Sequence, residues 1–179
     1  GNGRRNAGVS LKWLLPEALT EAYSFDDFQV LTGLINTSLN TEIREELGLV
    51  YSLKASSRGA SYDAAVWELA VDLNCDVEKR QEVINAVQKT VTEMTKQLIP
   101  QSKIDSLIKG MKEEREQRFN RAEAQANLLA QNNILRESDE PHSLELDKRF
   151  QGITPQRLDE LLKLFMGNQS TVVEISSLP

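Results

Sequence analysis

A single apolar stripe that leads directly into two alternating segments is the feature that most constrains the fold of this chain. Ser24 and Asp27 form a capping-box pattern before the stripe, and Gly48 stands where a left-handed C-cap belongs. The sequence therefore predicts one long helix over residues 24–47, with one face buried. The stripe recurs at steps of three and four residues and consists of Phe28, Leu31, Ile35, Leu39, Ile43 and Leu47.

Segments with strand-like alternation lie on both sides of this helix. Apolar residues alternate with mixed or polar residues over 9–15, 49–56 and 65–75. A turn predicted at 58–60 makes the second and third of these strands antiparallel. A short β-branched segment, 172–175, predicts a fourth strand. Each of the first three strands has one apolar and one more polar face, and the polar face carries Lys12, Lys54, Glu68 and Asp72.

Three more helices are predicted between the third and fourth strands. Asp76 can cap the first of them, and Ser102 begins a second capping-box pattern. Gly110 and the charged stretch 112–121 in the second helix indicate a solvated face or a kink. Thr154, followed by proline, caps the third. The predicted fold class is α+β: two layers, with an antiparallel sheet and helices packed on one of its faces.

The composition sets broad limits on function. The chain has 179 residues, 40% of them hydrophobic and 27% charged, with a net charge of −6. These values are typical of one globular domain, predicted to span residues 1–179. An acidic balance without a basic cluster argues against a nucleic-acid partner, and no apolar run approaches the ~18 residues of a membrane span. The start at Gly-Asn-Gly, without methionine, predicts a piece of a longer multidomain protein.

The residues that usually carry enzyme chemistry are scarce. His142 is the one histidine and Cys75 the one cysteine, and Cys75 lies on the apolar face of its strand. Residues 142–146 match four fifths of the zinc motif H-x-x-E-H, but Leu146 replaces the second histidine. No glycine-rich phosphate loop or serine-nucleophile elbow is present. The sequence therefore predicts no metal site and no catalytic residue in this chain.

Arg44 and Tyr51 remain as candidate functional residues, on either side of the helix end. In the simpler interpretation, Arg44 is a cation that stabilises the last helical turn and Tyr51 is a strand aromatic among core residues. In the other, the chain reverses at Gly48, so that the guanidinium and the phenol reach one groove. Both groups can donate hydrogen bonds to a carbonyl oxygen.

The segment from Ile43 to Ser52, Ile-Arg-Glu-Glu-Leu-Gly-Leu-Val-Tyr-Ser, resembles the L-R-E-x-x-G-L-x-Y segment of insulinase/pitrilysin-type zinc metallopeptidases (inverzincins). The match is to their C-terminal, non-catalytic domains, and the order of predicted elements agrees with it along nearly the whole chain. The resemblance implies the LuxS/MPP-like α+β fold of that family. It also implies that Arg44 and Tyr51 are the substrate-binding pair. Arg44 would hold backbone carbonyls of a peptide, and Tyr51 would stabilise the oxygen that gains charge in the transition state.

What the resemblance implies about partners follows from the missing zinc motif. Zn²⁺ would lie in the catalytic half of the parent protein, on the same chain or on a partner subunit, and this chain alone would be inactive. The alternatives are a structural or scaffolding homologue without a peptidase role and a free-standing partner subunit. Periplasmic localisation would follow by resemblance for a bacterial protein, and the single cysteine leaves the compartment open.

Overall fold

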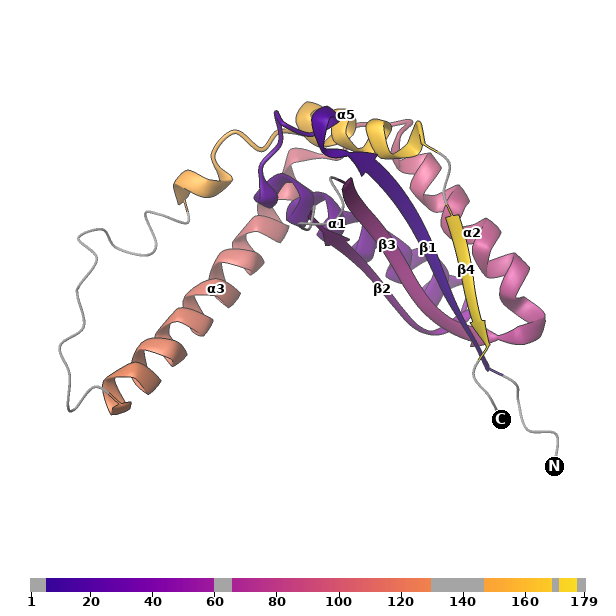
Figure 1. The fold of residues 1–179 in the computed structure, drawn as a ribbon, viewed down its shortest axis with the longest axis horizontal. Coiled ribbons are helices and arrows are strands. Elements are labelled where there is room, and N and C mark those ends of the chain that lie inside the picture. The colour runs from indigo at the N-terminus through magenta and orange to yellow at the C-terminus, as the bar shows by residue number, and fades with distance from the viewer. Residues whose placement is uncertain (1–5, 60–65, 130–146, 169–170, 177–179) are drawn as a thin grey trace.

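One antiparallel sheet organises the molecule in the computed structural model, which describes residues 6–59, 66–129, 147–168 and 171–176 (Figure 1). The strands are arranged in the order β2-β3-β1-β4, so β1 and β3 are central. All three pairings are antiparallel. The strands are β1 (Asn6–Pro16), β2 (Val50–Arg58), β3 (Val66–Asp76) and β4 (Thr171–Ser176).

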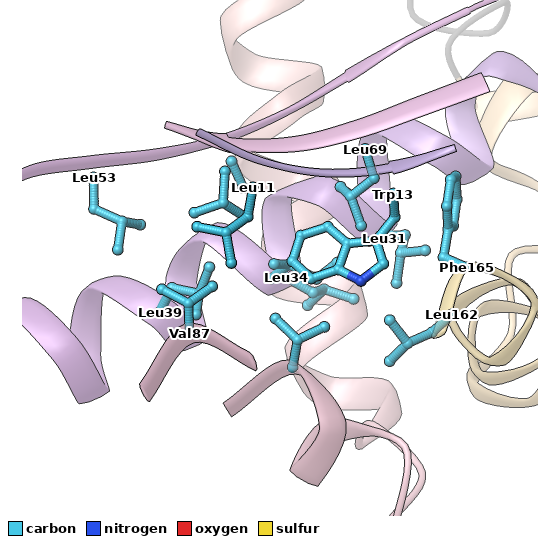
Figure 2. Close-up of a cluster of buried hydrophobic side chains, with 14 of the residues drawn as sticks. Leu11, Trp13, Leu31, Leu34, Leu39, Leu53, Leu69, Val87, Leu162 and Phe165 are labelled. Atoms are coloured by element: carbon cyan, nitrogen blue, oxygen red, sulfur yellow. The ribbon is translucent and has the colours of Figure 1, made fainter. Parts of the chain in front are cut away.

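The helices form the second layer. Figure 2 shows side chains from α1, α2 and α5 meeting the strands on one side of the sheet. The helix α3 begins in this layer and then extends away from the body of the molecule (Figure 1). The helices are α1 (Phe25–Leu39), the π-helical segment η2 (Asn40–Glu46), α2 (Arg80–Met94), α3 (Gln101–Leu129) and α5 (Pro155–Met166), with short 3-10 turns η1 (Glu17–Leu19) and η3 (Val77–Lys79). The predicted two-layer α+β class is confirmed.

The core lies between the two layers, where the predicted apolar faces meet. On β1, Leu11 and Leu15 are fully buried, and on α1 so are Ile35 and Leu39. Cys75 is also buried, as its place on the strand predicts. Burial of this apolar surface is the main stabilising term for a domain of this size.

The opposite face of the sheet is polar, as predicted. Lys54 and Asp72 are exposed there, while Lys12 and Glu68 are partly buried and form an ion pair with 3.4 Å between Nζ and Oε2. The helices leave this face uncovered within the described part of the chain (Figure 1). We refer to it below as the open face.

Two predicted helix starts have the expected geometry. Ser24 caps α1: its backbone N–H donates to Asp27 Oδ2 at 2.6 Å, and Asp27 N–H donates back to Ser24 Oγ at 3.3 Å. Thr154 Oγ1 accepts from Arg157 N–H at 3.3 Å, directly before the proline of α5. Both caps satisfy backbone donors that the helix itself leaves without partners.

The long helix predicted over 24–47 is present from Phe25 to Glu46, but its last seven residues, Asn40–Glu46, are π-helical. Two predicted capping residues were wrong. The helix α3 begins at Gln101, so Ser102 lies inside it rather than capping it, and it continues through Gly110. Asp76 precedes η3, but its side chain makes no cap hydrogen bond.

Candidate functional site

The end of the first long helix is a π-helical turn that contains Arg44. Leu47 N–H donates to Glu42 O, five residues earlier, at 3.1 Å, and Leu49 N–H donates to Ile43 O at 3.1 Å. The wider turn keeps Ile43 fully buried while Arg44 is exposed. Short π-helical segments are rare and occur often at functional sites.

Gly48 then reverses the chain. Its φ of +59° lies in the left-handed region, where a side chain would be strained, and this confirms the predicted C-cap. The next two residues, Leu49 and Val50, return to the core. The chain therefore passes from the exposed Arg44 to strand β2 within a few residues.

Tyr51 lies in a β-bulge at the start of β2. Val50 pairs with Cys75 and Ser52 pairs with Asn74, so Tyr51 is the extra residue between two successive rungs. The simple alternation placed Tyr51 on the apolar side with Leu53, but the bulge shifts the phase and leaves its side chain 47% exposed. Tyr51 is therefore not a core aromatic, and that interpretation is wrong. Bulges are known to re-aim side chains in this way.

The Tyr51 hydroxyl has a specific partner on the neighbouring strand. It donates a hydrogen bond of 2.6 Å to Asp76 Oδ1, at the end of β3. Sequence reasoning missed this role of Asp76, because the two residues are 25 positions apart and their contact depends on the bulge. One rung along, Asn74 Nδ2 donates to Ser52 Oγ at 2.9 Å. Both bonds link β2 and β3 at the same end of the sheet.

Arg44 differs from Tyr51 in its contacts. Its side chain is exposed, and it makes no hydrogen bond or ion pair with another residue in the described ranges. It also lies in the last turn of the π-helical segment, where a cation is favourable. The structure thus presents two exposed hydrogen-bond donors on either side of one chain reversal.

Zinc does not fit the part of the chain that is described. Its His, Cys, Asp and Glu side chains nowhere gather in a group of three or more that could hold a metal ion. A zinc site needs at least three such protein ligands. His142 and the incomplete motif that begins with it lie outside the described residues. The described helices also include none that is both long and apolar enough to cross a membrane.

A second polar cluster lies at the other end of α1, away from the π-helical turn. Asp26 accepts from Arg115 of α3 at 2.7 Å and from Arg149 at 2.9 Å, and Asp27 accepts from Arg157 of α5 at 2.7 Å. Arg115 belongs to the charged stretch 112–121, and its contact with Asp26 shows that this part of the stretch is not a solvated face. The carboxylates in the first turn of α1 were visible in the sequence, but their partners were not.

A comparison with protein-family models shows the family of this chain. The model described as the peptidase M16 inactive domain matches residues 2–111, which is more than half of the chain. The chain belongs to this family. It is the inactive, C-terminal type of domain from a protease family, as the resemblance to insulinase-type peptidases predicted. A search of curated proteins found no match.

Solved structures share the fold of this inactive domain. The periplasmic protease PqqL from Escherichia coli aligns with a TM-score of 0.65 and 14% identity, over 98% of this chain and 19% of that protein. The first half of PqqL aligns with a TM-score of 0.66 and 21% identity, over 94% of this chain and 38% of that half. An M16 inactive domain from Pseudomonas fluorescens aligns with a TM-score of 0.56 and 16% identity, over 98% of this chain and 43% of that one.

These similarities show only a shared fold, because all three sequence identities are low. The chain spans about a fifth of the length of full-length PqqL and about two fifths of the other two structures. The same α+β unit occurs in the first half of PqqL, so a unit of this fold is accompanied by others in those proteins.

Proposed function

We propose that this inactive domain binds peptide substrate for a zinc metallopeptidase whose zinc lies in another part of the parent protein or in a partner subunit. Arg44 would hold backbone carbonyls of the peptide. Tyr51 would donate its hydroxyl proton to the carbonyl oxygen that becomes negative during hydrolysis. The observation that carries this proposal is the bulge, which makes Tyr51 47% exposed at a position where the alternation would otherwise bury it.

The hydrogen bond to Asp76 limits how Tyr51 can act in such a reaction. A phenol has one proton, and here it is donated to Asp76 Oδ1 at 2.6 Å. For the proposed role, the Tyr51 hydroxyl must turn its hydrogen bond from that carboxylate to the substrate oxygen. An oxygen with a full negative charge competes for the proton better than a neutral carbonyl does, because charge-assisted hydrogen bonds are stronger. The bond to substrate would therefore form mainly in the transition state, where it accelerates the reaction.

The same contact favours a second candidate function. In a scaffolding homologue without a peptidase role, Tyr51 would only join β2 to β3 through Asp76, and Arg44 would only stabilise its helical turn. The two candidates predict different effects of the same substitutions.

The test is Tyr51→Phe in the full-length parent protein. We expect kcat to fall by roughly 10²–10³ with a smaller change in KM, since the lost hydrogen bond is strongest in the transition state. Ser57→Ala is the control on the same strand, because it removes the hydrogen bond that Gln29 Nε2 donates to Ser57 Oγ at 3.2 Å and leaves Tyr51 in place. An unchanged kcat in Tyr51→Phe would favour the scaffold.

Arg44→Ala tests the other half of the proposal. We expect KM to rise with little change in kcat, because a residue that holds the peptide backbone binds the substrate and the transition state alike. Thermal unfolding of the same variant distinguishes the alternative. A lower Tm with unchanged KM would mean that Arg44 serves only the helix end.

A further inference from the structure

A hollow on the open face begins one rung from Tyr51 and has the features of a binding subsite. Its volume is about 310 Å³, and it spans strands β1, β2 and β3. The strand register places its side chains in two adjacent rows. Ser52, Asn74 and Gly8 form the first row, and Lys54, Asp72 and Ser10 form the second. Gly8 has no side chain, so no side chain fills the first row at its β1 position.

The polar groups of the second row lack partners. Lys54 and Asp72 lie opposite each other on β2 and β3, yet neither makes an ion pair or a hydrogen bond within the described ranges. Ser10 is 9% exposed, and its Oγ is buried without a hydrogen-bond partner. Buried polar atoms without partners are uncommon in folded proteins, and each calls for an explanation.

Other charged residues of the open face lie outside the hollow. Lys12 and Glu68 form an ion pair at 3.4 Å, whereas Arg58, opposite Glu68 on β2, is exposed and makes no ion pair with another described residue. Within the hollow, a donor on β2 and an acceptor on β3 lie opposite each other, and they fit an occupant that carries both donors and acceptors.

We propose that the hollow is a subsite for a neutral hydrogen-bonding side chain of the peptide, of the amide type found in glutamine and asparagine. This inference rests on the proposal that the domain binds peptide. An amide oxygen accepts from the Lys54 ammonium, and its NH2 group donates to the Asp72 carboxylate. Ser10 lines the same hollow and supplies a hydroxyl that can donate or accept a hydrogen bond. An apolar side chain would bury these groups without partners, and a charged one would meet one like charge.

The test uses the full-length parent and a peptide that it cleaves. The peptide is remade with Gln, Leu, Lys or Glu at each position within about three residues of the cleaved bond. Three residues of an extended peptide span about 10 Å, which matches the three positions along β2 between Tyr51 and Lys54. At one of these positions we expect kcat/KM to be about tenfold higher for Gln than for Leu.

Two single substitutions should then shift this selectivity in opposite directions. Lys54→Met leaves the Asp72 carboxylate, so the Lys peptide should gain about tenfold over the Glu peptide; Asp72→Asn leaves the ammonium, so the Glu peptide should gain by a similar factor. Ser10→Ala should reduce the preference for Gln without lowering Tm. Lys12→Met is the matched control on the same face, and it should leave the ratios unchanged.

The outcomes separate this subsite from the proposed role of Tyr51. Tyr51→Phe should lower kcat for all four peptides by the same factor and leave their ratios unchanged. If the ratios respond to Lys54 and Asp72 while Tyr51→Phe has no effect, the subsite stands and the role of Tyr51 falls. Ratios that stay constant in both the Lys54 and Asp72 variants, or that change equally in Lys12→Met, would overturn the subsite.

Discussion

At the scale of single residues, Asp26 and Asp27 show how charges are buried in this domain. Both carboxyl-bearing residues are almost fully buried at the start of α1, with 4% and 1% of their surface exposed. Carboxylates there are favoured by the helix dipole and by guanidinium partners. Arginines from α3 and α5 supply these partners, so the cluster ties three distant segments of the chain together.

Asp27 gives a pH-dependent prediction at this scale. Burial alone would raise the pKa of Asp27, but hydrogen bonds from Arg157 and Ser24, together with the charge of Arg157, hold this pKa below its ordinary value of 3.8. A lowered pKa in the folded state stabilises the protein above pH 3.8, and this stability is lost as the pH falls through the lower folded value. We expect Asp27→Asn to cost about 2–3 kcal/mol of unfolding free energy near pH 7, because Arg157 loses a buried partner.

Urea unfolding measured between neutral pH and pH 3 checks this expectation. The difference between the wild type and Asp27→Asn should shrink in acid, because the wild type loses the contribution that the variant already lacks. Asp105→Asn, at an exposed position of α3, is the control and should stay within about 0.5 kcal/mol of the wild type. A difference that stays constant with pH would show that ionisation of Asp27 does not contribute.

At the scale of elements, the junction between α1 and β2 depends on two backbone features. Gly48 holds the left-handed conformation that ends the π-helical turn, and the bulge that follows exposes Tyr51. The side of β2 away from β3 is partly closed by α1, because Asn36 Oδ1 accepts from Ala55 N–H at 3.0 Å. Such contacts prevent an edge strand from pairing with other chains.

Two glycine substitutions should have opposite effects on stability. Gly48→Ala forces a side chain into the left-handed region, with φ at +59°, and should cost about 1 kcal/mol. Gly110→Ala, inside α3 with open space around the added carbon, should stabilise by about 0.5–1 kcal/mol. Thermal unfolding checks both, with expected Tm shifts of about 2–4 °C in opposite directions. A Gly48→Ala variant as stable as the wild type would contradict the role of the positive φ.

Asn36→Ala should open the edge of β2. The N–H of Ala55, whose surface is 6% exposed, would lose its acceptor, at a cost of about 1–2 kcal/mol. Hydrogen exchange at the Ala55 amide should become faster. Asn36→Asp is the matched control, because a carboxylate retains the acceptor. Equal exchange rates in Asn36→Ala and the wild type would show that the contact does not protect the edge.

At the scale of the whole molecule, the described residues form one antiparallel sheet with one layer of helices, and the chain spans 19–43% of the length of the three similar solved structures. Its sequence contains no complete H-x-x-E-H motif. The proposed division of labour therefore assigns zinc to another half and peptide binding to this one.

We expect the isolated 179-residue chain to show no peptide hydrolysis with or without added zinc. A quenched fluorescent peptide library measures this, with the full-length parent as the positive control. If the zinc-bearing half is a separate chain, mixing the two should restore activity. Zinc-dependent hydrolysis by this chain alone would contradict the proposal, provided that the hydrolytic activity co-purifies with the chain and is absent from a Tyr51→Phe preparation.

The sequence by itself determined the elements and their layers. Periodicity of two or of three to four residues predicts which face of each strand or helix is buried, and the caps at Ser24, Gly48 and Thr154 depend on groups only a few residues apart. The α+β class followed, because each strand has one apolar face and needs a single layer of helices. The family resemblance also came from one short local segment.

Only the tertiary structure decided the rest, because the interactions involved connect distant residues. The bulge that exposes Tyr51 results from pairing with β3, and its partner Asp76 is 25 positions away. The Asp26–Arg115 contact joins residues 89 positions apart, and no periodic pattern can select one arginine among many. The hollow on the open face likewise exists only where three strands align in register. Local periodicity determines how a segment folds, whereas the contacts that could give this domain a function depend on how its segments pack together.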